Sequence, residues 1–273
     1  MAYIIGIDVG GSTTKIVGME EGRIVAPMFI TAADPVTSLF GAFGKYMHDN
    51  GIRLTDIAQI MLTGVGSAFI NTPLYGLPTH KVDEFIANGL GARHATDLSR
   101  LVVVSMGTGT SFVRLDGDRI NHIGGVGIGG GTLQGLSRLL LKTDDFRRIA
   151  EIAEQGDITR INLQIGDISN RALPDLPMNA TASLFGKVDS NATPADIAKG
   201  IICLVLQTIG GAAVLAALNS TIKDFVLIGN LTQLPQCHEI FSNMERIYHV
   251  HFHIPPYAEY RTAIGAALAH ERI

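Results

Sequence analysis

The sequence predicts an α/β protein of two duplicated lobes, and three observations indicate this class. Apolar segments rich in Ile and Val, typical of buried strands, alternate with longer amphipathic segments typical of helices. A strand, a Gly/Ser/Thr turn and a second strand occur twice, around "DVGGSTTK" and around "SMGTGTSF". The length of 273 residues is enough for two lobes, each with a core of its own.

The expected elements follow from periodicity and from residues that stop helices. Pro35 and Gly51 bracket one helix, and Phe85, Ile86 and Leu90 give another its apolar face. Strands are expected over 3–9, 13–20, 23–30, 225–229 and 246–256. The segment 57–66 is expected to be a strand that runs into a loop, and 101–120 to be two strands on either side of a turn at 107–109. Helices are expected over 35–50, 82–96, 132–141, 143–156, 196–218 and 261–273, with an irregular connection over 171–194.

Composition excludes several classes of protein. Hydrophobic residues make up 47% of the chain and charged residues 17%, as in a globular protein. The formal net charge is -4 with no basic run, so nucleic acid is not an expected partner. Cys203 and Cys237 stand far apart without metal-binding spacing, which indicates reduced thiols and a cytoplasmic location. The N-terminus lacks the basic region of a signal peptide and is expected to form a strand.

The apolar run "IAKGIICLVLQTIGGAAVLAALNS" is long enough to suggest a membrane span. Lys199, Gln207 and two glycines interrupt it, and no other segment resembles a span. We therefore expect a buried core helix and no membrane partner.

The stretch "INHIGGVGIGGGTLQG", Ile120–Gly135, concentrates glycine ahead of a helical segment. Such a loop at a helix N-terminus is typical of an anion site, so we expect glycines 129–131 to cradle phosphates with backbone N–H groups. A mobile surface loop is the alternative. The stretch matches neither a Walker loop nor a complete Rossmann fingerprint.

Polar side chains at the two turns could handle phosphate. Asp8 beside a phosphate-binding turn would repel phosphate unless Mg²⁺, held through water, lay between them; the alternative is a turn-capping aspartate. Lys15 offers a positive charge, or is a solvated lysine at a strand end. The expected contacts of the facing turn are Gly107, Thr108, Gly109, Thr110 and Ser111.

Phosphoryl transfer to an alcohol also needs a carboxylate that accepts the hydroxyl proton. Asp83 and Glu84 in "KVDEF" are the candidates, and either could be an ordinary acid at a helix N-terminus. Spacing alone leaves the choice open.

Five motifs, in the family's order along the chain, carry a family resemblance: "GIDVGGSTTKIV", "KVDEF", "VSMGTGTSF", "GGVGIGGGTLQGL" with "LLLKTDDFRRIAEIAEQGD", and "FVLIGN". They resemble the actin-like ATPase superfamily of sugar kinases, actin and heat-shock chaperones, and within it the type II, eukaryotic-like pantothenate kinases. The third and fourth motifs together are specific to that family; the first alone indicates the superfamily.

The resemblance implies an actin-like fold with duplicated mixed-sheet lobes and a nucleotide in the cleft between them. The expected division is an N-terminal lobe over 1–97, a nucleotide-binding lobe over 98–259, and a closing helix over 260–273 that returns toward the first lobe. It further implies a kinase that phosphorylates the hydroxyl of pantothenate with ATP and Mg²⁺, the first step of coenzyme A synthesis. A homodimer is also implied, with 196–218 as a candidate interface.

The resemblance also assigns roles to residues. Glu84 matches the catalytic glutamate, and Thr108, Ser111 and His122 match positions that look toward the acceptor. Asp8 would organise Mg²⁺ through water. The implied ATP contacts are Asp8, Val9, Gly10, Gly11, Ser12, Thr13, Thr14, Lys15, Thr108, Gly130, Gly131, Thr132, Leu133, Gln134, Phe146 and Asn230.

One position departs from the family pattern, because His122 stands where the family usually has an arginine. Arg114 and Arg119 are near in sequence and are candidate substitutes. An actin-like kinase for a different small alcohol is therefore an alternative. Two others are the ATPase activator of a 2-hydroxyacyl-CoA dehydratase, which would need cluster-binding cysteines, and a non-catalytic nucleotide-gated binding protein.

Overall fold

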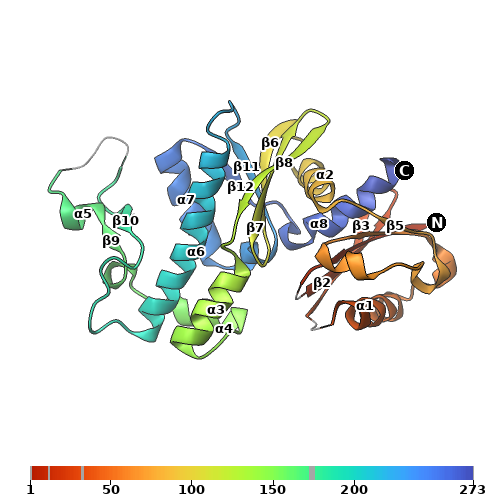
Figure 1. The fold of residues 1–273 in the computed structure, drawn as a ribbon, viewed down its shortest axis with the longest axis horizontal. Helices are drawn as coiled ribbons and strands as arrows, with labels where there is room; N and C mark the ends of the chain where they lie inside the picture. The colour runs from red at the N-terminus through yellow and green to blue at the C-terminus, as the bar shows by residue number, and fades with distance from the viewer. Residues whose placement is uncertain (1, 12, 32–33, 172–175, 273) are drawn as a thin grey trace.

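Two lobes, each built on a five-stranded sheet, make up the chain in the computed structural model, which describes residues 2–11, 13–31, 34–171 and 176–272 (Figure 1). The strands of the first sheet are β1 (Tyr3–Val9), β2 (Thr13–Glu20), β3 (Arg23–Thr31), β4 (Ile57–Thr63) and β5 (Thr79–Lys81). Their order is β3-β2-β1-β4-β5, with β1, β2 and β3 antiparallel and β1, β4 and β5 parallel.

The second sheet repeats this topology. Its strands are β6 (Arg100–Met106), β7 (Thr110–Asp116), β8 (Arg119–Val126), β11 (Asp224–Ile228) and β12 (His251–His253). In the order β8-β7-β6-β11-β12 the first three are antiparallel and the last three parallel, as in the first sheet. The predicted α/β class with duplicated mixed-sheet lobes is therefore confirmed.

Helix α1 (Pro35–Asn50) packs on the first sheet. The Asp34 side chain accepts from the backbone N–H of Thr37 at its start, and Gly51 ends it with a φ of 64°. Its buried residues Leu39, Phe43 and Tyr46 lie in one core with the strand residues Ile5, Ile7 and Ile60 of the sheet.

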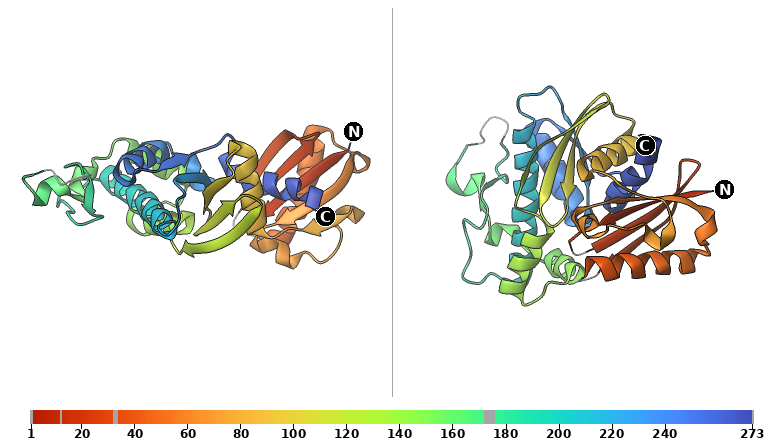
Figure 2. Two further views of the ribbon diagram at one scale, coloured as in Figure 1. Left: turned by 90° about the horizontal axis from the view of Figure 1, so that it is seen from above. Right: turned by 45° about the vertical axis from the view of Figure 1, so that its right-hand side comes forward.

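Two helices run between the sheets: α2 (Glu84–Thr96) and α8 (Arg261–Leu268) (Figures 1 and 2). They cross with backbone against backbone, since a Cβ at Gly91 would lie 2.0 Å from the Arg261 carbonyl oxygen, and one at Gly265 would lie 1.7 Å from that of Ala87. α8 also packs on β1 and β2, so the C-terminal helix completes the core of the first lobe.

The long helix α6 (Pro194–Ala216) packs with α3 (Gly130–Leu141), α4 (Phe146–Glu154) and α7 (Gln236–Tyr248) on one face of the second sheet. Among the described residues, α6 alone has the length and hydropathy of a membrane span, but 56% of its 18-residue apolar window is buried in the core. The expected core helix is therefore present.

An arm extends beyond α6 and α7 at the left of Figure 1, formed by β9 (Leu163–Gln164), α5 (Ile165–Ile168) and β10 (Thr181–Ser183). Part of the expected irregular connection, 172–175, lies outside the described residues. Single turns of 3-10 helix lie at Leu54–Asp56, Val65–Phe69, Leu74–Gly76, Ile158–Arg160, Asn230–Gln233, Ala258–Tyr260 and Ala269–Arg272.

Two sequence expectations were wrong in extent. The expected glycine loop begins only after Val126, because Ile120–Val126 belongs to strand β8. The expected strand over 246–256 is limited to β12, because α7 continues through Tyr248. One face of α7 is buried through Ile240, Phe241 and Met244. This packing stabilises the helix over the residues that follow, and the helix ends at His249, which has a φ of 52°.

Candidate active site

A cleft of about 1290 Å³ lies between the two sheets, with the turns of both β hairpins on its wall. The β1–β2 turn contributes Gly10 and Gly11, and the β6–β7 turn contributes Gly107, Thr108 and Gly109. The first turns of α2, α3, α4 and α8 also reach this cleft. Because helix N-termini carry partial positive charge, the cleft is suited to an anionic ligand.

The first hairpin places a buried ion pair in the cleft. Asp8 and Lys15 are cross-strand partners, and Lys15 Nζ lies 3.3 Å from Asp8 Oδ2. Gly64 follows β4 with a φ of 84°, and a Cβ there would lie 2.5 Å from Asp8 Oδ1. A glycine is therefore needed where the chain passes this carboxylate.

Asp8 fits a magnesium ion that arrives with a nucleotide. Mg²⁺ in kinase sites is held by one or two carboxylates together with waters and substrate phosphates. The hydroxyl oxygen of Thr63, the register neighbour of Asp8 on β4, is buried without a hydrogen-bond partner among the described residues. The described residues contain no group of three or more His, Cys, Asp or Glu placed to hold a metal by themselves.

The second hairpin packs against the start of α3. The N–H groups of Gly130 and Gly131 donate to the carbonyl oxygens of Gly107 and Thr108, at 2.8 and 2.9 Å. These two N–H groups are therefore not free for a phosphate, contrary to the expected cradle. A Cβ at Gly129 would lie 2.5 Å from the Thr108 oxygen, so the glycines permit this close approach.

Glu84 is the first residue of α2 and lines the cleft, half-buried. Burial raises the pKa of its carboxyl, and the nearby charge of Asp8 raises it further. Asp83 lies just outside the helix, where its side chain accepts from the N–H groups of Phe85 and Ile86 at 2.9 and 3.0 Å. Geometry thus gives Asp83 the capping position and places Glu84 in the cleft.

His122 does not line the cleft. Its ring stacks on Phe85, the residue after Glu84, with ring centroids 4.1 Å apart. His122 pairs with Val113 across the sheet, so the two side chains lie on the same face of the sheet. That face packs against α2. Arg114 lies on the opposite face by alternation, and Arg119 pairs with Asp116 at the far end of the hairpin. Neither arginine lines the cleft that Glu84 lines.

The structure brings most of the sequence-predicted residues together. Val9 and Leu133 have fully buried side chains in the cores, Thr14 is buried, and neither Thr14 nor Thr132 lines the cleft. Ser12 lies outside the described residues. The predicted residues that line the cleft are Asp8, Gly10, Gly11, Thr13, Lys15, Glu84, Thr108, Ser111, Gly130, Gly131, Gln134, Phe146 and Asn230.

Sequence reasoning missed several lining residues. Ser105 occupies the place in β6 that Asp8 has in β1, so the repeated strand–turn–strand pattern itself could have found it. The start of α8 also lines the cleft, through Glu259, Tyr260 and Thr262. No local sequence signal predicts that this segment reaches the cleft. Near the predicted Phe146, the missed acids Asp144, Asp145, Glu151 and Glu154 line the wall formed by α4.

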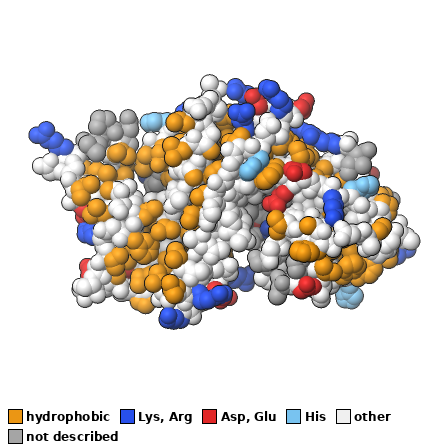
Figure 3. All heavy atoms as spheres, viewed as in Figure 1, with side chains coloured by type: hydrophobic (Ala, Val, Ile, Leu, Met, Phe, Trp, Pro, Cys, Tyr) orange, Lys and Arg blue, Asp and Glu red, His pale blue; other side chains and the backbone are white. Residues whose placement is uncertain are grey.

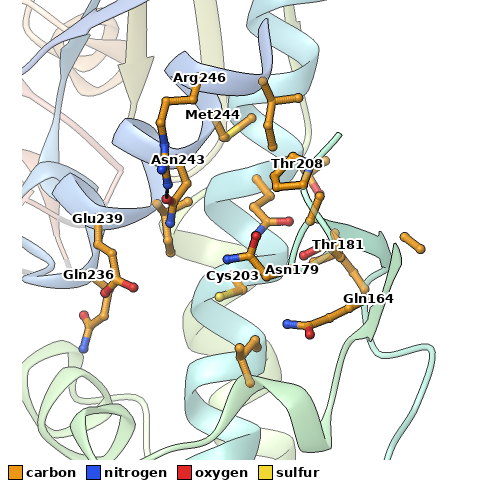
Figure 4. Close-up of a pocket in the computed structure, with 18 of the residues that line it drawn as sticks. Gln164, Asn179, Thr181, Cys203, Thr208, Gln236, Glu239, Asn243, Met244 and Arg246 are labelled. Carbon is orange, nitrogen blue, oxygen red and sulfur yellow. Dashed lines mark hydrogen bonds between the residues drawn. The ribbon is translucent and has the colours of Figure 1, made fainter. Parts of the chain in front are cut away.

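A second cavity, of about 790 Å³, lies outside the cleft between α6, α7 and the arm (Figure 4). Its labelled lining is mostly neutral and polar, with Gln164, Asn179 and Gln236 among its carboxamides. Cys203 lines it, whereas Cys237 is buried elsewhere in the same core. Burial raises the pKa of each thiol to about 12.

The duplicated mixed sheets around a shared cleft define a protein with the actin-like ATPase fold. Within that class, the chain belongs to the Fumble family, the type II pantothenate kinases: the family model, described as Fumble, matches residues 88–268. The matched range begins after Glu84 and the first hairpin, so the family match does not include them.

Similar proteins agree with this placement. The type II pantothenate kinase of Staphylococcus aureus (strain USA300) is 28% identical over 235 residues, which cover 83% of this chain and 84% of that protein. The activator of the 2-hydroxyisocaproyl-CoA dehydratase from Clostridium difficile, with bound ADPNP, superposes with a TM-score of 0.71 at 17% identity over 99% of this chain and 98% of its own. A ROK family glucokinase from Streptomyces griseus, in complex with glucose and AMPPNP, superposes with a TM-score of 0.64 at 12% identity. The match covers 99% of this chain and 100% of the glucokinase. At these identities the two structures show a shared fold.

Proposed function

We propose that the protein transfers the γ-phosphoryl group of ATP to the hydroxyl of pantothenate, the first step of coenzyme A synthesis. The observation that carries the proposal is the position of Glu84, a half-buried carboxylate in the same cleft as the Asp8–Lys15 pair and the Thr108 turn. Membership of the Fumble family and the relative from Staphylococcus aureus support pantothenate as the acceptor.

Glu84 would accept the proton of the acceptor hydroxyl while the oxygen of that hydroxyl forms a bond to the γ-phosphorus of ATP. The bond from that phosphorus to the bridging oxygen breaks in the same transfer, and ADP leaves. A carboxylate whose pKa is raised by burial is a stronger base than an exposed one. The base works only when ionised, so kcat should fall as pH falls through this raised pKa.

The nucleotide would lie along the two hairpin turns. Lys15 offers positive charge and Asp8 would hold Mg²⁺ through water; when bound, the ion neutralises phosphate charge. Asn230 Oδ1 is buried in this cleft without a partner among the described residues, which leaves it free to accept from a ligand. Thr108 and Ser111 line the same space, and their hydroxyls would orient the acceptor.

A direct assay tests the proposal. Purified protein with MgATP should release ADP in a pantothenate-dependent manner and form phosphopantothenate, detectable by mass spectrometry. ADP release that needs no acceptor would point instead to an ATPase of the activator type, and nucleotide binding with no turnover to a gated binding protein.

A different small alcohol is the second candidate acceptor, because His122 stacks on Phe85 and does not line the cleft. If His122 contacts pantothenate after the cleft closes, His122→Ala should raise the KM for pantothenate about three- to tenfold and leave that for ATP unchanged. His122→Arg should keep or raise pantothenate turnover. Unchanged pantothenate kinetics in the alanine variant would make His122 a bystander, and a set of small polyols should then be screened as acceptors.

We further propose a cytoplasmic homodimer that associates through the outer face of α6. Apolar side chains gather over this part of the molecule (Figure 3), and Leu215 is 69% exposed near the end of the helix. Leu215→Glu should halve the mass measured by light scattering. Leu54→Glu, on an exposed apolar residue of the first lobe, is the matched control.

A further inference from the structure

Two unpartnered polar groups lie on one face of α2. The carboxylate of Glu84 accepts no hydrogen bond from the described residues, although the residue is half-buried. One turn later, Asn88 is fully buried, and its amide nitrogen Nδ2 has no partner among them. A buried donor without an acceptor destabilises the fold, so such a group indicates a missing partner.

Helix geometry brings these two groups together. Glu84, Asn88 and Gly91 follow the spacing i, i+4, i+7, so they share the face of α2 that meets α8. Side chains on a helix lean toward its N-terminus, which directs Asn88 back toward the turn that carries Glu84.

Thr262 on α8 fixes the orientation of the Asn88 amide. Its hydroxyl donates to Asn88 Oδ1 at 2.7 Å, which turns Nδ2 away from α8. Thr262 is buried and lines the cleft together with Glu84. The pair therefore connects the cleft wall at the start of α8 to the helix that carries the base.

We propose that Asn88 and Thr262 are positioning residues for Glu84: when substrates close the cleft, Asn88 Nδ2 donates to the Glu84 carboxylate in an orientation that Thr262 sets. This inference rests on the proposed role of Glu84 as the base. Apo structures commonly show such catalytic hydrogen bonds unformed, because they tighten in the substrate complex.

The charges around Glu84 make a neutral donor useful. Asp8 on β1 and Asp83 before α2 are acidic, and Lys15 on β2 is the cation among these neighbours. Lys15 is already paired with Asp8. An amide donor would hold the carboxylate in place without adding a charge to the phosphate site.

The test compares variants that remove the donor with variants that keep it. Asn88→Ala and Thr262→Val should each lower kcat about tenfold, the scale of one hydrogen bond to a charged group, and leave the KM for ATP within about twofold. Thr262→Ser keeps the hydroxyl and should retain most of the activity. Ala87→Gly weakens the same helix crossing without touching the pair, and is the control for a loss of stability.

Two readouts separate positioning from packing. In a Glu84→Gln background, Asn88→Ala should have no further effect on kcat, because it acts through Glu84. Carboxyl 13C NMR should show the pKa of Glu84 rising further in Asn88→Ala and in Thr262→Val in the presence of MgADP and pantothenate, and staying unchanged in Thr262→Ser and Ala87→Gly. An equal loss of kcat in both backgrounds, or an unchanged Glu84 pKa in folded Asn88→Ala and Thr262→Val, overturns the proposal. The NMR titration needs MgADP and pantothenate to bind but needs no turnover, so it decides the inference even if the wild-type protein binds both and fails to phosphorylate pantothenate.

Discussion

The two hairpins of the duplicated sheets have the same topology but different chemistry. In the first, Asp8 pairs across the strands with Lys15, so a buried ion pair flanks the turn. In the second, Ser105 pairs with Ser111, so only hydroxyls flank the turn. The carbonyl oxygens of the second turn also accept hydrogen bonds from the start of α3. No described residue holds Gly11 in this way, and a Cβ added there would meet no described atom within 4 Å.

This difference indicates a division of labour within one repeated architecture. A charged turn can neutralise phosphate and hold a cation, whereas a neutral turn fixed by a helix can orient hydroxyl groups without attracting a metal. If the cleft binds MgATP as proposed, differences at these few positions would give each of the two similar walls its own role.

The largest expected effect comes from the residue between the two walls. Glu84→Gln should lower kcat by about 10²-fold or more, the usual scale for a positioned general base, and leave ATP affinity unchanged in a calorimetric titration. Wild-type kcat should fall toward low pH, because Glu84 has a raised pKa and becomes protonated there. The residual kcat of Glu84→Gln should not show this fall.

Asp83→Ala is the matched control. It removes the N-cap and should cost about 1 kcal/mol of unfolding free energy while kcat stays near wild type. If kcat collapses in Asp83→Ala and survives in Glu84→Gln, the roles of the two acids are reversed.

The next effect contrasts equivalent positions of the two hairpins. Asp8→Asn should lower kcat about 10²-fold, because it removes the carboxylate that would hold Mg²⁺, whereas Ser105→Ala should change kcat less than about threefold. Initial rates over a series of Mg²⁺ concentrations check this. Similar losses in both variants would mean that the two walls are not specialised.

The smallest expected effect separates the two turns themselves. At Gly131 a Cβ would lie 3.0 Å from Thr108 Cγ2 and 3.1 Å from its carbonyl oxygen, so Gly131→Ala should displace the second turn. We expect a rise in the ATP dissociation constant of about three- to tenfold, and less than twofold for Gly11→Ala. A larger effect at Gly11 would show that the open turn, and not the fixed one, sets the nucleotide position.

Local sequence signals were sufficient for much of the fold. The strands around each turn are short apolar runs between glycines, and the helix that starts at Glu84 has an aspartate cap in front of an apolar face. The placement of Glu84 in the cleft depended on the family resemblance, because Asp83 and Glu84 are equally suited to a helix start by sequence alone.

The remaining features depend on tertiary contacts that no local pattern encodes. Gly124 and Gly125 belong to a strand because β8 bulges past β7 there: Gly124 has a φ of 144°, and a Cβ at Gly125 would lie 2.7 Å from the Thr110 oxygen. The sequence correctly indicated a backbone that approaches something closely, but the neighbour is another strand. The same bulge sets which way His122 faces.

The contact of α8 with β1 and β2 has a consequence for biosynthesis. Ala263 and Ala267 cover Gly6 and Val17, so the first lobe lacks part of its core until α8 has been made. In the second lobe, β11 pairs with β6, which lies far from it in the sequence; Phe225 is the partner of Val102. Pairings of such high contact order form slowly. The first lobe therefore cannot complete its core on the ribosome before α8 has emerged, so it should acquire its stable fold late in synthesis.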